Sequence, residues 1–160
     1  MTTKILSENV VHFIKGLDAV ADAFDGTVYS DVVDVSAAKT ITFLVHKGVG
    51  ATGTSTLTVQ PCDDVTPSNT GTSVAFNYRI CTSGDTWGAL TAAAAAGFDT
   101  TAGSSQLYAV EVDTDVMAAS GYKYCRLKCV EVVNSPVLGG IVVMLSGLRY
   151  AGDSVASQID

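Results

Sequence analysis

The fold is decided by one apolar stretch near the end of the chain, Tyr122-Lys-Tyr-Cys-Arg-Leu-Lys-Cys-Val-Glu-Val-Val-Asn-Ser-Pro-Val-Leu-Gly-Gly-Ile-Val-Val-Met-Leu145. Its first arm, 122–133, alternates strictly, with the period of a β-strand. One face carries Lys123, Cys125, Leu127, Cys129 and Glu131, and the other carries Tyr122, Tyr124, Arg126, Lys128 and Val130. The second arm, 141–145, is apolar at every position. Because Asn134-Ser-Pro136 and Gly139-Gly140 supply turn chemistry, residues 122–150 predict one β-hairpin.

A hairpin with a wholly apolar arm needs cover on both faces, from a second sheet or from another subunit. Hydrophobic residues make up 48% of the chain and charged residues only 16%, against about 25% in an average protein. A subunit whose surface is covered by neighbours needs fewer charges than a monomer, so the composition favours a homo-oligomer or a larger assembly. The alternative is that the many Ser and Thr side chains replace charge as solvating groups.

Charge and hydropathy exclude two classes of partner. The formal net charge is −7, and an acidic protein without a basic patch repels phosphate backbones, so we expect no nucleic-acid binding. The longest apolar stretch, 137–145, is far shorter than the ~20 residues of a membrane span and contains two glycines. The N-terminus lacks the apolar core of a secretory signal. We expect a protein made in a cytoplasm that stays soluble.

The rest of the chain predicts short strands and few helices. Strands are expected at 9–14, 27–29, 32–35, 40–47, 54–60, 73–81 and 106–113. Residues 16–24 fit one or two turns of helix or a strand from residue 20, and 114–121 fits one helical turn with Asp or Thr as N-cap and Gly121 as its stop. The alanine run 92–96 fits a helix or an irregular loop. We therefore predict an all-β, antiparallel, jelly-roll-like sandwich with one or two helical turns.

These segments form one predicted domain, residues 1–150. Within it, residues 1–8 are a possible N-terminal arm. Residues 151–160 are expected to be a tail, flexible or ordered by a partner.

The sequence Gly48-Val-Gly-Ala-Thr-Gly53 matches the GxGxxG pattern of dinucleotide folds and follows a predicted strand. A phosphate site needs a helix to open at the last glycine, so that free N–H groups meet the pyrophosphate. Here Thr54-Ser-Thr-Leu-Thr-Val-Gln60 is β-branched and alternating, which predicts another strand. The glycines are interpreted as a hairpin loop, and we expect no nucleotide and no cofactor.

Catalytic and metal-binding patterns are weak. His12 and His46 lie on predicted strands without a nucleophile or ligand partner at suitable spacing. The paired carboxylates Asp63-Asp64 and Asp31/Asp34 have no flanking aromatic cleft. We therefore expect neither an enzyme nor a metal site.

The four cysteines, Cys62, Cys81, Cys125 and Cys129, contain no CxxC pair. We expect these cysteines to act as small, buried hydrophobic residues of a protein in a reducing compartment. A disulfide between Cys62 and Cys81, near the ends of neighbouring predicted strands, stays open.

Two series of residues carry a resemblance to a known family. They are Asp113…Met117-Ala-Ala-Ser-Gly-Tyr122…Arg126-Leu127…Glu131-Val-Val-Asn-Ser-Pro-Val-Leu-Gly-Gly140-Ile…Leu145…Arg149-Tyr150 and Thr42-Phe…Gly48…Thr54-Ser-Thr-Leu-Thr-Val-Gln60-Pro-Cys. Over residues 40–150 they resemble small virion structural proteins of tailed bacteriophages. The resemblance implies a capsid decoration (cement) protein, commonly a trimer bound to the major capsid protein on the outer capsid surface. It equally fits a head–tail connector or a tail component.

Under this interpretation, candidate subunit or capsid contacts are Trp87, Phe98, Val137, Leu138 and Tyr150. Trp87 is the only tryptophan and lies in a predicted loop, where it could also pin that loop to the body. A third hypothesis, a carbohydrate- or surface-binding module, would use Trp87, Tyr78 and Tyr108 as stacking groups.

Overall fold

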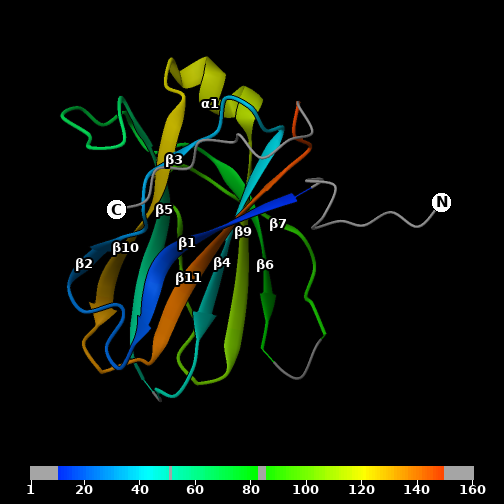
Figure 1. Ribbon diagram of the computed structural model, residues 1–160. Helices are drawn as coiled ribbons and strands as arrows, with labels where there is room; N and C mark the ends of the chain where they lie inside the picture. Colours follow the sequence, from blue (N-terminus) through cyan, green and yellow to red (C-terminus); the bar gives the residue numbers. More distant parts are fainter. Residues whose placement is uncertain (1–10, 51, 83–85, 150–160) are drawn as a thin grey trace.

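Two antiparallel sheets face each other in the computed structural model, which describes residues 11–50, 52–82 and 86–149 (Figure 1). Sheet A contains, in spatial order, β1 (Val11–Val20), β11 (Gly139–Ser146), β4 (Thr40–Lys47), β9 (Gln106–Asp113), β6 (Phe76–Cys81) and β7 (Thr91–Ala93). Sheet B contains β2 (Thr27–Tyr29), β10 (Tyr124–Val133), β5 (Thr54–Cys62) and β8 (Phe98–Asp99), with β3 (Val33–Asp34) also paired to β10. The predicted all-β sandwich is confirmed.

The strand order is that of a jelly roll. With β3, β6 and β7 set aside, β1-β11-β4-β9 faces β2-β10-β5-β8. Successive strands of the chain then alternate between the two sheets, except that β5 and β8 both lie in sheet B. The pair β6 and β7 then extends sheet A beyond β9. The N-terminal arm and the C-terminal tail that the sequence predicts lie outside the described residues.

The prediction that residues 122–150 form one hairpin is wrong. Strand β10 pairs with β5, β2 and β3 in sheet B, whereas β11 pairs with β1 and β4 in sheet A. Residues 134–138 therefore cross from one sheet to the other. This crossing puts the buried sides of both strands into the same core, Leu127 and Cys129 from β10 and Val143 and Leu145 from β11.

The glycine loop is not a hairpin loop either, because β4 and β5 also lie in different sheets. The strand that follows it does exclude the helix that a dinucleotide site requires. Figure 1 shows this link and the β10–β11 link at the same end of the sandwich, opposite α1. We call this end the loop end.

Residues 16–24 form neither the expected helix nor a strand from residue 20. β1 continues to Val20 because it pairs along β11, with Leu17 opposite Ile141 and Val20 opposite Gly139 across two register shifts. A turn over residues 21–24 follows, and it buries Phe24 in the core. Long-range pairing thus overrides the helical spacing of the apolar residues.

The alanine run is also different from both expectations. β7 includes Ala92 and Ala93, a turn follows, and β8 begins at Phe98. Gly97 has φ +80° at this turn, and an added Cβ would collide with the carbonyl oxygen of Leu57 on β5. The chain can pass this close to β5 only because residue 97 is glycine.

The expected helical turn is present as α1 (Thr114–Ser120). The side chain of Asp113 accepts a hydrogen bond from the Asp115 backbone N–H, so Asp113 is the N-cap. Gly121 ends the helix with φ 82°. Met117 is the buried residue of α1.

Candidate interaction surface

The outer face of sheet A is apolar along β1, β11 and β4. Strand register places Phe13 beside Met144 and Val142 beside Leu44. Phe13 and Val142 are 47% and 45% exposed, and Met144 and Leu44 are half-buried. We call these four side chains the open face.

The open face follows from the composition of β11. Its alternate residues Ile141, Val143 and Leu145 point inward and are buried against sheet B. The sequence predicts cover on both sides of this strand, but within the described residues only the inner side has it. Val142 is therefore left half exposed to solvent on a sheet face that usually carries polar groups.

Thr42 lies in the open face between Met144 and Glu111 in the sheet register. Its side chain is buried, and its Oγ1 has no hydrogen-bond partner within the described part of the chain. Buried hydroxyls nearly always have a partner, because leaving one without costs about 1–3 kcal/mol. The open face thus contains an unsatisfied polar atom as well as apolar side chains.

The outer face of sheet B has a different character. Its half-buried positions on β5 are Thr54, Thr56, Thr58 and Gln60. Arg126 on β10 donates two hydrogen bonds to the Gln60 side chain, at 2.8 and 3.0 Å, and stacks on the ring of Tyr29. These side chains make this part of the outer face of sheet B more polar than the open face.

Charged groups flank the open face on both sides. Lys15 on β1 lies in the same cross-strand row as Val142, and Glu111 on β9 lies in the row of Met144 and Thr42. Both are exposed. Three strand spacings separate β1 from β9, about 14 Å. Lys15 also forms a salt bridge with Asp18 at 3.3 Å, and exposed Arg79 on β6 is paired with Ala109 of β9. Each margin of the apolar centre therefore carries charges of both signs.

The five contact residues that the sequence predicts differ in burial. Trp87 is 38% exposed and Leu138 is 43% exposed, whereas Val137 is buried. Phe98 is half-buried and its ring stacks on Tyr78 at 3.7 Å between centroids, and both rings pack against the core. Tyr150 lies outside the described residues.

Leu138 belongs to the loop end. Its backbone N–H donates to the carbonyl of Val49, and its own carbonyl accepts from the Gly48 N–H at 2.6 Å. Val49 is 74% exposed. Two links that are far apart in sequence thus present aliphatic side chains together, and sequence inspection missed Val49 because the glycine loop was treated as a simple turn.

Phe13 and Val142 were also missed as surface residues. The signal for Val142 was present, because a strand with apolar residues on both faces needs two covers. For Phe13 the sequence gives only an alternating strand, and its neighbour across the register becomes known only from the pairing of β1 with β11.

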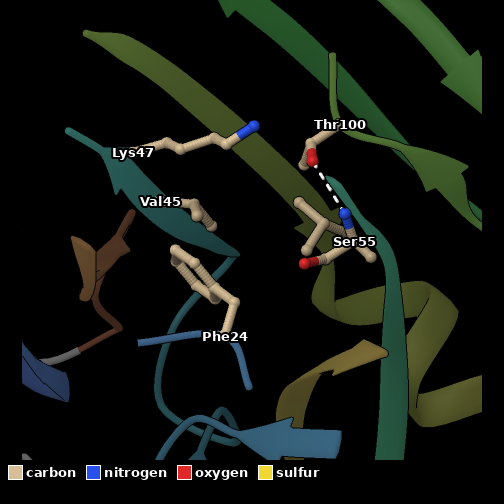
Figure 2. A pocket seen from close by; sticks show the side chains of 6 residues that line it. Phe24, Val45, Lys47, Ser55 and Thr100 are labelled. Atoms are coloured by element: carbon tan, nitrogen blue, oxygen red, sulfur yellow. Dashed lines mark hydrogen bonds between the residues drawn. The ribbon is translucent and has the colours of Figure 1, made fainter. Parts of the chain in front are cut away.

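A buried amine lies beneath the loop end (Figure 2). Lys47 continues the inward-facing row of Ile41, Phe43 and Val45 on β4, and it is only 2% exposed. Its Nζ donates to the carbonyls of Gly53 at 2.5 Å and Thr101 at 2.6 Å. Burial lowers the pKa of Lys47. The ammonium therefore connects the β4–β5 link, which contains Gly53, to the β8–β9 link, which contains Thr101.

A small pocket lies beside the Lys47 side chain. Its walls are mostly apolar, formed by Phe24, Val45 and Leu57, and Ser55 and Thr100 complete it. The Ser55 backbone N–H donates to the Thr100 hydroxyl, as Figure 2 shows. These groups satisfy each other, so the pocket is structural packing.

The rings of the carbohydrate hypothesis do not form an exposed platform. Tyr108 is fully buried, and its hydroxyl donates to Gln106 Oε1 at 2.6 Å and accepts from the Thr101 N–H. Tyr78 is stacked on Phe98. Trp87 is left as the exposed ring of the three.

The described residues bring no catalytic or metal-binding group together. Within them, no set of three or more His, Cys, Asp or Glu side chains could hold a metal ion, and His12 and His46 lie on different strands. Asp63 Oδ2 accepts hydrogen bonds from Ser68 and Asn69; these bonds, that of the Ser68 hydroxyl first, lower the pKa of Asp63. This is a turn motif.

The cysteines are buried. Burial raises the pKa of the Cys129 thiol to about 12 and raises that of Cys125 as well, with a smaller contribution from neighbouring Cys62. Cys62 and Cys81 lie on β5 and β6, in different sheets. The sequence predicts that the strands carrying these two cysteines are neighbours, and this prediction is wrong. Among the described segments, no helix has the length and apolar character needed to span a membrane.

Comparison with known proteins gives one structural similarity. No protein-family model matches the chain, and no curated protein matches it significantly. Among solved structures, the chain is similar to the crystal structure of the SPBc2 prophage-derived protein YomS, with 13% sequence identity over 83% of this chain and 92% of that chain. The TM-score is 0.44. The fold is established by the strand order of this chain.

Proposed function

We propose that this chain is a non-enzymatic structural protein of a tailed-phage virion. Its role is that of a capsid decoration protein, which binds the major capsid protein on the outer surface of the head as a homo-oligomer. The family resemblance of residues 40–150 supports this role and implies a trimer. The virion location follows from the role and has the same support.

The observation that carries the proposal is the open face. A decoration protein binds through area rather than through a reaction, and each Å² of apolar surface removed from water stabilises a contact by about 25 cal/mol. Covering the exposed half of Phe13 and of Val142 contributes roughly 1 kcal/mol each by this measure. Such contacts are weak singly, and a shell that repeats the binding site multiplies them.

The polar groups of the molecule agree with a binding role. The polar side chains of Lys47, Tyr108 and Arg126 each have hydrogen-bond partners within the fold. A glycan-binding role receives less support, because Tyr108 is buried in the core and Tyr78 is packed against it. A connector or tail role uses the same kind of surface and differs in copy number.

The test is quantitative mass spectrometry of particles purified from cells that encode this chain. Hundreds of copies per particle are expected for a decoration protein. A few to a dozen copies would assign the chain to the head–tail joint or the tail. Absence of the chain from purified particles would refute a virion role.

A further inference from the structure

We propose that the loop end is a docking surface for a partner protein whose own contact surface has an apolar centre and a margin of lysine or arginine side chains. The loop end is separate from the open face, which lies on the outer side of sheet A. The inference goes beyond the proposed function, because it depends on the loop end alone and not on the virion role.

Aliphatic side chains gather at the loop end. The Leu138 N–H donates to the Val49 carbonyl, and the pairing of β1 with β11 puts Val20 beside Gly139. The last two residues of β10 adjoin the same link. The aliphatic residues here that are between 43% and 74% exposed are Val20, Val49, Val132, Val133 and Leu138. Exposed apolar residues that gather in this way are typical of a contact surface.

Backbone contacts hold these residues in one arrangement. The Ala23 N–H donates to the Val137 carbonyl at 3.0 Å, and the Glu131 N–H donates to the Gly26 carbonyl at 2.7 Å. From beneath, Lys47 donates to the carbonyls of two links. A surface that already has its bound shape loses little conformational entropy when a partner binds.

The acidic side chains of the loop end have no ion-pair partner. Asp22 accepts a hydrogen bond from the Val137 N–H at 3.4 Å, and Glu131 accepts one from the Gly26 N–H at 3.0 Å. Asp25 is exposed and lies next to Gly26. Within the described residues, none of these three carboxylates forms a salt bridge. They place negative charge beside the exposed aliphatic side chains.

The basic side chains nearest to this end do not offset that charge at the surface. Lys47 is buried, and Lys15 forms a salt bridge with Asp18 further back along β1. Exposed His46 lies beside Gly140 in the sheet register, on the outer side of β4. The exposed surface of the loop end is therefore apolar with an acidic margin.

This charge determines which partner the loop end attracts. Two copies that met loop end to loop end would bring carboxylates against carboxylates, because both would present the same surface. Phosphate groups of nucleic acids and of anionic lipids would be repelled for the same reason. A protein surface with lysine or arginine side chains around an apolar centre gains from apolar burial and from charge attraction together.

The first test uses a defined probe, a synthetic amphipathic helix with leucine on one face and lysine on the other. It is titrated into the isotope-labelled full chain, and the NMR signals of the five exposed aliphatic residues are expected to shift. Val49→Asp and Val132→Asp should each weaken binding at least about tenfold, because each puts a charge into the apolar centre of the contact. A contact made by charge alone would become tighter instead, since both variants add a carboxylate.

Val116→Asp is the matched control for these two variants. Val116 is 38% exposed and lies on α1, at the opposite end of the sandwich (Figure 1). Its replacement adds the same charge away from the contact and should not weaken binding. Circular dichroism melting checks that each variant is folded, and either Val49→Asp or Val132→Asp suffices for the comparison.

The second test separates the acidic margin from the apolar centre. Asp25→Asn should weaken binding of the leucine–lysine peptide about threefold, whereas Asp115→Asn on α1 should leave it unchanged. The difference should shrink with added salt, because salt screens exposed charges. A peptide with glutamate in place of lysine tests the sign of the charge, and vesicles of neutral phosphatidylcholine test a lipid surface.

Four results would overturn the inference. They are no binding of the leucine–lysine peptide, equally tight binding of the glutamate peptide, unchanged affinity in both Val49→Asp and Val132→Asp, and binding to the neutral vesicles that Val49→Asp abolishes. None of these results depends on whether the chain is found in purified particles. The proposed virion role therefore stands or falls separately.

Discussion

Replacing Lys47 by methionine tests what holds the loop end together. Methionine has a similar length and fits the apolar walls of the neighbouring pocket, which include Phe24, Val45 and Leu57. The substitution removes the ammonium and both of its hydrogen bonds, to the carbonyls of Gly53 and Thr101. It leaves the packing of the side-chain stem nearly unchanged.

The expected loss of stability is about 2 kcal/mol at neutral pH. Hydrogen bonds from a charged donor contribute roughly 1.5–3 kcal/mol each, so losing two gives about 3–6 kcal/mol. Removing a buried charge returns part of this, because the ammonium no longer has to be desolvated. The net effect is a loss, since two carbonyls are left without their donor.

The pH dependence provides a second signature with a defined sign. Burial lowers the pKa of Lys47 in the folded protein below its ordinary value of 10.5. The cost of burying the ammonium is fully present below the folded-state pKa and disappears as the pH rises to the unfolded-state value. Wild type therefore gains stability relative to Lys47→Met as the pH rises toward 10.5.

The assay is urea unfolding of wild type and Lys47→Met at several pH values from 7 to 10. Exposed Lys39 provides the control, because Lys39→Met should change the free energy of unfolding by less than about 0.5 kcal/mol. If Lys47→Met is as stable as wild type, or if the difference between them shrinks as the pH rises, the buried amine does not hold the loop end as described.

Three further outcomes test the fold and its thiols. Gly97→Ala should lower the free energy of unfolding by about 3 kcal/mol or more, because the added Cβ meets the Leu57 carbonyl. Gly121 has nearly the same φ with open space around it, so Gly121→Ala should lower that free energy by only about 1–2 kcal/mol. Similar melting temperatures for the two variants would contradict the close approach of residue 97 to β5. Leu127→Ala, at a fully buried position, should lose about 2–5 kcal/mol in urea unfolding, and a loss under 1 kcal/mol would place that side chain outside the core. With its pKa raised to about 12, the Cys129 thiol should not react with an aromatic disulfide reagent at pH 8 until the protein is unfolded, so rapid labelling of Cys129 in the native protein would refute its burial.

Local patterns predicted much of the secondary structure. The strict alternation of residues 106–113 and 40–47 matches β9 and β4 as they are observed. Cys125, Leu127 and Cys129, which share one face of the alternating strand, are buried. The glycine stop of α1 could be read from sequence because cap chemistry is local.

Pairing between distant segments could not be read in the same way. Turn residues at 134–140 show that the chain changes direction, but they do not show whether it returns to the same sheet or crosses to the other. The helix expected at 16–24 is absent for a related reason, because Leu17 and Val20 pair with β11, more than a hundred residues away. The open face was predictable only in part. The unbroken apolar run at 141–145 predicts that Val142 needs cover, whereas the alternating strand around Phe13 predicts nothing of the kind.

The most direct measurement of the central claim is the mass of the unmodified chain in solution. The account holds that one chain leaves the outer side of β11 uncovered and that a neighbour covers it. Light scattering should therefore give a multiple of 16.5 kDa that falls toward one chain on dilution. A constant mass of one chain at every concentration, with the protein folded and soluble, would contradict it.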